Sequence, residues 1–289
     1  MSVIHRGEQL MPQVRLHFSH VATFIFLILI SFVFFIGVHG FYFQNWHTGA
    51  ARVAAKFLPI PAAIVEGDII WYKQVSETAN LLIAAEEESE GAFDMALEAV
   101  IRQVYVEHLA EELGVSVTRD EVSAYEVDMI DGFLEEVGWS EREYRNYVVK
   151  PLLLAQKTEE ALLNSYDYQA IARDDLAKVL LDLELGIPFS DLAEQYSEDG
   201  SAVFGGDIGL FEKFKLPVGM EPVWDLEVDQ VSEILDLGDS YALVKVYDNV
   251  VLEGERTHVA LQVILVKKAT LSEVLEDFAR AQEVKVFVR

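Results

Sequence analysis

The stretch from Phe189 to Phe211 constrains the fold of this chain more than any other. Four apolar residues at its start have the spacing of one helix face: Phe189, Leu192, Ala193 and Tyr196. A polar turn, Ser197 to Ser201, follows them. Gly205, Gly206 and Gly209 then permit positive φ angles and close backbone approach. The pattern predicts a helix, a loop and a glycine-rich turn entering an apolar strand, which on spacing alone also fits a structural corner of any α+β domain.

The order of these residues resembles the parvulin family of peptidyl-prolyl cis-trans isomerases. In that family a helix ending Phe-x-x-Leu-Ala-x-x-Tyr-Ser leads through a polar loop into Gly-Gly-Asp-Leu-Gly-x-Phe. This chain has Ile208 in place of the second Leu, and its loop is about one residue shorter. Further along, other family positions are matched by Trp224, Leu226, Val231, Ser232, Tyr241 and Val244. The resemblance implies an α+β, parvulin-like domain, which we expect over residues 168–289.

The resemblance also implies where the chemistry of such a domain would lie. Prolyl isomerisation crosses a barrier of about 18–20 kcal/mol without a covalent step, so the site needs an apolar pocket and a polar network beside the imide bond. In parvulins two histidines and a Cys or Asp form that network. Here Asp199 keeps the acidic position, whereas Ala242 and Val263 replace both histidines. The expected substrate-binding residues are those two positions together with Leu216, Met220 and Trp224.

These replacements leave the activity open. A pocket without its network would bind a proline-containing chain and accelerate its isomerisation only weakly, whereas an active isomerase would use Asp199 and groups that the pattern does not reveal. Ordinary core packing explains Met220 and Trp224 equally well. His258 stands five residues before Val263, so strand alternation directs its side chain to the opposite face, and we expect a surface histidine.

The family's opening strand has no counterpart ahead of this domain's first helix, because residues 164–170 are polar. The C-terminal end supplies an apolar run at residues 259–266, followed by a short helix over 271–279 and a strand over 284–288. A sheet without its central strand would leave backbone groups unpaired in the core. We therefore predict a permuted sheet in which residues 259–266 fill the central position.

Residues 58–167 are predicted to form a helical domain that begins with a small hairpin around Glu66-Gly67-Asp68. The start of this region resembles the SurA-like chaperone domain at five positions: Pro59, Pro61, Ala63, Val65 and Gly67. The resemblance implies apolar grooves that hold unfolded segments and no catalytic site. A plain helical spacer is the alternative.

Within that region, apolar spacing predicts a helix over residues 93–113 with Gly114 as its C-cap. Capping boxes at Thr118–Glu121 and Ser140–Glu143 predict the starts of two further helices. Pro151 lies inside the last helical pattern and predicts a kink or a break there.

Val21–Phe43 contains no charged residue and is long enough to cross a bilayer core, which needs about 20 apolar residues in a helix. We expect a transmembrane helix over residues 21–44 in contact with lipid and a cytoplasmic tail over residues 1–20; a buried soluble helix is the alternative. Basic residues on the two sides nearly balance. A single N-terminal anchor before a long acidic body favours a single-pass cell-membrane protein with its bulk outside the cytoplasm.

The chain has 22 basic and 49 acidic residues, a net charge of −27, which argues against nucleic acid as a partner. It has no cysteine and no motif of a hydrolase, zinc or nucleotide site, so we expect no metal or cofactor. The resemblances imply a membrane-anchored extracytoplasmic folding factor that binds unfolded or proline-containing polypeptide, with isomerase activity weak or lost. A fully active peptidyl-prolyl isomerase and a non-catalytic structural membrane protein are the alternatives.

Overall fold

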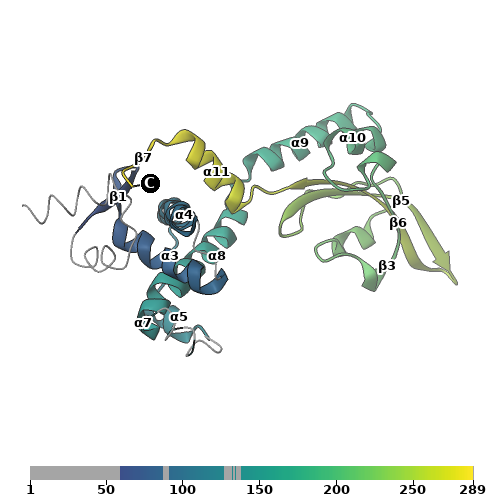
Figure 1. Ribbon diagram of the computed structural model, residues 1–289. Helices are drawn as coiled ribbons and strands as arrows, with labels where there is room; N and C mark the ends of the chain where they lie inside the picture. Colours follow the sequence, from purple (N-terminus) through teal and green to yellow (C-terminus); the bar gives the residue numbers. More distant parts are fainter. Residues whose placement is uncertain (1–58, 87–90, 127–131, 133, 135–137, 289) are drawn as a thin grey trace, which may run out of the picture. The chain divides into compact units, whose positions relative to one another are not determined.

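The computed structural model describes residues 59–86, 91–126, 132, 134 and 138–288 (Figure 1). The expected cytoplasmic tail, residues 1–20, and the expected membrane helix, residues 21–44, lie outside these ranges. Among the helices that are described, none combines the length and the apolar character that a bilayer crossing requires. Two compact units can be distinguished: one contains the described residues up to Val100 together with residues 284–288, and the other is Ile101–Glu283.

The first unit is built on a three-stranded antiparallel sheet in the order β2-β1-β7. Strands β1 (Pro61–Val65) and β2 (Asp68–Trp71) form the predicted hairpin. Its turn has Glu66 at φ 53° and Gly67 at φ 100°. Two positive φ angles in a two-residue loop match the right-handed twist of the strands, which explains why this turn closes the hairpin.

The third strand, β7 (Val284–Val286), corrects the predicted extent of the C-terminal domain. We assigned residues 284–288 to the parvulin-like domain, but β7 pairs with β1 through Ala63 and Val286. Ala63 and Val65 are fully buried, so the middle strand β1 needs a partner on each edge. The Phe287 N–H donates to the Ala62 carbonyl at 2.8 Å and completes this pairing.

Helices α3 (Tyr72–Glu86) and α4 (Ala92–Glu112) follow the hairpin. The aromatic rings of Tyr72 and Phe93 lie 5.2 Å apart between their centroids. Gly114 has φ 68°, and its N–H donates to the Glu111 carbonyl, while the N–H of Val115 donates to Ala110. The predicted C-cap at Gly114 is therefore confirmed, with the left-handed residue that ends many helices.

The helical part of the second unit contains α5 (Arg119–Ala124), α7 (Glu141–Tyr144), the π-helical turn η1 (Arg145–Val149) and α8 (Lys150–Leu163). Both predicted capping boxes are present, at Thr118 and at Ser140. Pro151 lacks an N–H, and its ring crowds the carbonyl four residues earlier. The chain accommodates it by widening the preceding turn, in which the Lys150 N–H bonds to the Arg145 carbonyl five residues back.

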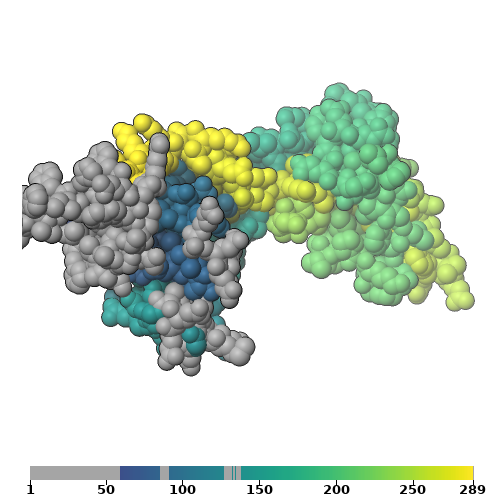
Figure 2. All heavy atoms as spheres, in the orientation of Figure 1, coloured from purple at the N-terminus to yellow at the C-terminus, as the bar shows by residue number. Residues whose placement is uncertain are grey.

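The second unit also holds a four-stranded antiparallel sheet in the order β3-β6-β5-β4. Its strands are β3 (Asp207–Glu212), β4 (Leu235–Asp236), β5 (Ser240–Leu252) and β6 (Glu255–Lys267). Because β6 pairs with β5 on one side and with β3 on the other, the predicted interior position of residues 259–266 is confirmed. The far ends of β5 and β6 continue as a projecting hairpin, yellow-green in Figures 1 and 2, whose turn has Gly254 at φ 88°.

Strand alternation gives the sheet two apolar faces. Helices α9 (Ala170–Glu184) and α10 (Phe189–Tyr196) cover one of them (Figure 1). The buried side chains on that side are Ala172, Leu176, Val179, Phe189, Leu192, Ala193, Tyr241, Leu243, Ile264 and Val266. The opposite face is covered by the segment that contains the short 3-10 turns η3 (Lys213–Lys215) and η4 (Glu221–Asp225).

Helix α11 (Leu271–Ala281) follows β6 and begins with a capping box at Thr270. The predicted helix over residues 271–279 is thus confirmed. It contacts α8, and the ring of Phe278 lies 6.5 Å from that of Tyr105 between centroids. The chain therefore leaves the four-stranded sheet at the end of β6 and returns to the helices of the same unit.

Candidate functional site

The five predicted substrate-binding residues meet on the sheet face opposite α9 and α10. Met220, Ala242 and Val263 belong to one buried cluster, with exposed fractions of 4%, 0% and 2%. Leu216 and Trp224 are partly buried and pack against the same cluster. Since Ala242 and Val263 have almost no accessible surface, these two positions form packed core in this structure, and no substrate atom can touch them without a rearrangement.

The loop that carries Asp199 is attached to β6 next to this cluster. The Glu198 N–H donates to the Leu265 carbonyl at 2.8 Å, and the Val263 N–H donates to the Gly206 carbonyl at 2.8 Å. The Leu265 N–H also donates to the Ser197 hydroxyl at 3.1 Å. These bonds continue the pairing of β6 beyond the end of β3. They hold Asp199 on a segment that is fixed at both ends to the strand of Val263.

The carboxylate of Asp199 organises its own loop. It accepts the Ser201 N–H at 2.8 Å, two residues further along, at the entry to the turn η2 (Ala202–Phe204). The Ser201 hydroxyl and N–H lower the pKa of Asp199 below its usual value, against the opposing effect of partial burial. Asp199 is therefore an anion at neutral pH and does not serve as a proton donor there; its catalytic role stays a prediction.

Two glycines allow this loop to lie against α10 and β6. A Cβ atom on Gly206 would lie 2.4 Å from the Val263 carbonyl oxygen, and one on Gly205 would lie 2.8 Å from the Ser190 Cβ. Both residues also have positive φ angles, 81° and 68°. The predicted need for glycine at these two positions is confirmed, and its cause is both the backbone conformation and the close approach of Gly205 to α10 and of Gly206 to β6.

Arg256 was missed by the sequence analysis. One of its Nη atoms donates to the carbonyl oxygens of Trp224 and Leu226, each at 2.7 Å. These bonds anchor the covering segment at η4 to strand β6. The Lys213 ammonium lies 5.7 Å from the centroid of the Trp224 ring. Nothing in the local pattern around Arg256 signals these contacts, which join residues about thirty positions apart.

Several apolar side chains on the consecutive elements η2, β3 and η3, and just after η3, are exposed. Phe204 on η2 and Phe214 on η3 are 75% and 80% exposed. The full set, called the 203–218 apolar set below, consists of Val203, Phe204, Leu210, Phe214 and Val218. His258 is partly exposed, and its Nε2 atom lies 3.8 Å from a carboxylate oxygen of Glu212. Within the described part of the chain, no cluster of three or more acidic or histidine side chains could hold a metal ion.

Comparison with known proteins adds two family matches. A family model described as SurA-like N-terminal domain matches residues 10–165, more than half of the 289 residues. A model described as PPIC-type PPIASE domain matches residues 153–248.

Three curated relatives are similar to parts of the chain. "Foldase protein PrsA" of Oceanobacillus iheyensis is 28% identical over 144 residues, covering 49% of this chain and 42% of the relative. "Foldase protein PrsA" of Halalkalibacterium halodurans is 33% identical over 121 residues, covering 36% of each. "Foldase protein PrsA 1" of Bacillus cereus is 41% identical over 73 residues, covering 25% of this chain and 26% of the relative. Each match thus spans less than half of the relative's length.

Proposed function

Because the chain belongs to the SurA-like N-terminal domain family and carries a PPIC-type, parvulin-like isomerase domain, we propose that it is an extracytoplasmic folding factor that binds unfolded or proline-containing polypeptide. The observation that carries this proposal is the presence of both domains, in this order, in one chain. The names of the relatives, each described as a foldase, support the same class of function.

The proposal includes weak or absent isomerase activity. Ala242 and Val263 stand where the family's two histidines would be, and neither side chain can donate or accept a hydrogen bond. Their burial supports this view, because the apolar core fills the space that a polar network would need. A fully active isomerase is the second candidate; it is favoured by the PPIC-type match and by the fixed, anionic Asp199 beside β6.

Clients would bind at the 203–218 apolar set. Large exposed apolar side chains are frequent at interaction sites, and those of this set lie on consecutive segments of the chain. An unfolded polypeptide offers matching apolar side chains, and burying each of them on Phe204 or Phe214 removes apolar surface from water. The substrate contacts would then lie around the packed cluster rather than inside it.

The membrane anchor remains part of the proposal. The uncharged run Val21–Phe43 supports a single-pass cell-membrane protein with residues 1–20 in the cytoplasm and the bulk outside it. The net charge of −27 supports polypeptide rather than nucleic acid as the partner.

The proposal also includes a permuted parvulin sheet. It is supported by the end of the PPIC-type match at residue 248, ahead of the interior strand β6.

A binding measurement with a permanently unfolded, dye-labelled client tests the proposal. The full chain in non-ionic detergent should bind the client, and the double substitution Phe204→Ser with Phe214→Ser should weaken binding clearly. Leu181→Ser with Leu185→Ser is the matched control, because these side chains, on α9 and at its C-cap, are 61% and 80% exposed and lie outside the set. No binding by the unmodified chain would leave the structural membrane protein as the better explanation, and equal losses in both variants would refute the location.

A further inference from the structure

The second unit contains a cavity of about 780 Å³ lined by α5, α7 and the turn η1. Its charged lining consists of four cations and one anion: Arg119, Arg142, Arg145, Lys150 and Glu141. We call it the basic cavity. Such a concentration of positive charge is unexpected in a chain that carries 22 basic against 49 acidic residues. The cavity is not part of the site on the four-stranded sheet.

Arg145 has a structural role at this cavity. Its Nε atom lies 2.8 Å from a Glu141 carboxylate oxygen, and its Nη1 atom donates to the carbonyl oxygens of Val122 and Tyr125 at 2.7 and 3.1 Å. These bonds tie the end of α5 to η1. They also neutralise Glu141, the single carboxylate in the lining.

The other three cations, Arg119, Arg142 and Lys150, are exposed, and none of them forms an ion pair with another described residue. Two nearby carboxylates are already engaged. Glu121 binds Lys157 at 2.7 Å and caps α5, and Glu143 accepts the Ser140 N–H at 2.8 Å. Like charges that lie close together repel one another, so an anionic ligand would relieve this repulsion.

The shape of the site favours an extended ligand. A second cavity of about 560 Å³ shares Arg142, Asn146 and Lys150 with the first and adds Ser140, Glu143 and Tyr147. The Glu143 carboxylate in its lining already accepts hydrogen bonds from the N–H and the hydroxyl of Ser140. Together the two cavities are larger than a single phosphate requires, and they offer apolar surface at Val117 as well as the amide of Asn146. Guanidinium and ammonium groups bind carboxylates, and the amide bonds to backbone groups of an extended chain.

We propose that the basic cavity binds an acid-rich segment of an extended polypeptide, with Arg142 and Lys150 in contact with its carboxylates. This inference rests on the proposed function, because the ligand is a client polypeptide. It goes further by assigning a second binding place and the chemistry of the segment that occupies it. The net charge of −27 disfavours binding of an acid-rich segment over most of the chain.

Fluorescence anisotropy tests the inference with the full chain in non-ionic detergent. The probe is a dye-labelled peptide rich in Glu, and its twin carries Gln at every Glu position. The Glu peptide should bind more tightly, and added salt should weaken it. The double substitution Arg142→Gln with Lys150→Gln should weaken binding about tenfold, the sum expected for two partly exposed ion pairs.

Lys178→Gln with Arg280→Gln is the matched control. It removes the same net charge from α9 and α11, at two exposed residues that do not line the cavity. Binding should change little in this control. Equal losses in both double variants, or equal binding of the two peptides, would overturn the inference. Tight binding of inorganic phosphate with no binding of the Glu peptide would also overturn it. The unfolded-client assay separates the two proposals. If Phe204→Ser with Phe214→Ser weakens binding of the unfolded client but not of the Glu peptide, that loss bears on the 203–218 apolar set and leaves the basic cavity unaffected.

Discussion

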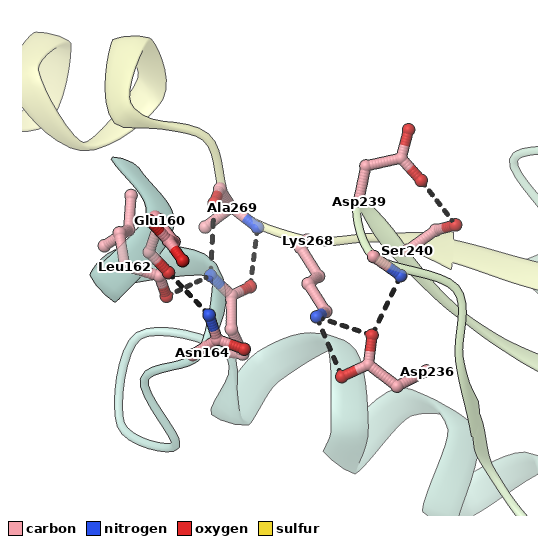
Figure 3. A network of polar contacts seen from close by, with 10 residues as sticks. Glu160, Leu162, Asn164, Asp236, Asp239, Ser240, Lys268 and Ala269 are labelled. Carbon is pink, nitrogen blue, oxygen red and sulfur yellow. Dashed lines mark hydrogen bonds and ion pairs between the residues drawn. The ribbon is translucent and has the colours of Figure 1, made fainter. Parts of the chain in front are cut away.

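The ammonium group of Lys268 lies 2.7 and 2.9 Å from the two carboxylate oxygens of Asp236 (Figure 3). The Lys268 side chain is only 1% exposed, whereas that of Asp236 is 52% exposed. The ring of Tyr241 lies 4.6 Å from the Lys268 ammonium and provides a second favourable contact. The pair stands where the chain leaves β6 for α11. The two partners therefore contribute differently to stability. Removal of Asp236 leaves a buried cation without a counter-charge, whereas removal of Lys268 leaves a half-exposed anion that water can solvate.

The two single substitutions should accordingly differ in cost. Asp236→Asn should lower the free energy of unfolding by about 3 kcal/mol, because an uncompensated buried charge remains. Lys268→Met should cost about 1 kcal/mol or less, since the thioether chain fills the site and water solvates Asp236. Urea unfolding of both variants measures the difference. Lys178→Met is the control: it removes an exposed ion pair with Asp175, with an expected cost of about 0–1 kcal/mol. The reverse order of the first two costs would contradict the assignment.

The same pair predicts a pH dependence. Burial by itself raises the pKa of Asp236, but the Lys268 ammonium and the Gly238 N–H outweigh burial and hold that pKa below its usual value. A carboxyl group whose folded pKa is depressed contributes stability above its unfolded pKa, about 3.9, and loses that contribution as the pH falls through the folded value. When unfolding is measured from pH 6 down to about pH 3, the free energy of unfolding should fall less steeply in Asp236→Asn than in the unmodified chain. Parallel curves would contradict the assignment.

Gln169 joins chain segments that lie 100 positions apart. Its buried amide nitrogen donates to the carbonyl oxygens of Leu162 and Ala269 at 3.0 and 3.1 Å, and its amide oxygen accepts the Ala269 N–H at 2.7 Å. Figure 3 shows Ala269 next to Lys268, facing the end of α8 at Leu162. Gln169→Leu should cost about 1–3 kcal/mol, because backbone groups lose their partner. Hydrogen exchange at the Ala269 amide should speed up in this variant, while unchanged exchange would show that the amide is protected by other means.

Gly206 and Gly254 form a matched pair for a packing test. Both have positive φ angles, 81° and 88°. A Cβ atom at Gly206 would lie 2.4 Å from the Val263 carbonyl oxygen, whereas at Gly254 it would meet nothing within 4 Å. Gly254→Ala should therefore cost about 1 kcal/mol from backbone strain, and Gly206→Ala clearly more, because the loop must also move away from β6. Thermal unfolding measures both losses of stability. Equal losses would mean that the loop moves away from β6 at little energetic cost.

The sequence predicted the features that local chemistry determines. Capping boxes at Thr118 and Ser140, the C-cap at Gly114 and the glycine turn at Gly206 each depend on residues close together in the chain. The interior position of β6 was also predicted, because a sheet core requires a central strand.

Contacts between distant segments were not predicted. A strand as short as β7 does not show in its own residues which sheet edge it joins, so its pairing with β1 was missed. The side-chain bonds of Arg256 and Gln169 to distant carbonyl groups leave no periodic pattern. The candidate site was predicted as a group of residues, but the burial of Ala242 and Val263 depends on the covering segment and appeared only in the structure.

We infer that this parvulin-like domain has packed core at Ala242 and Val263, where the family has its catalytic histidines. The rate of cis-trans isomerisation of a proline peptide in the presence of the full chain tests it most directly. We expect a rate close to that of the peptide alone, with relaxation over tens to hundreds of seconds at 25 °C. A strong acceleration that Asp199→Ala abolishes would contradict it, because it would show a working polar network around that carboxylate.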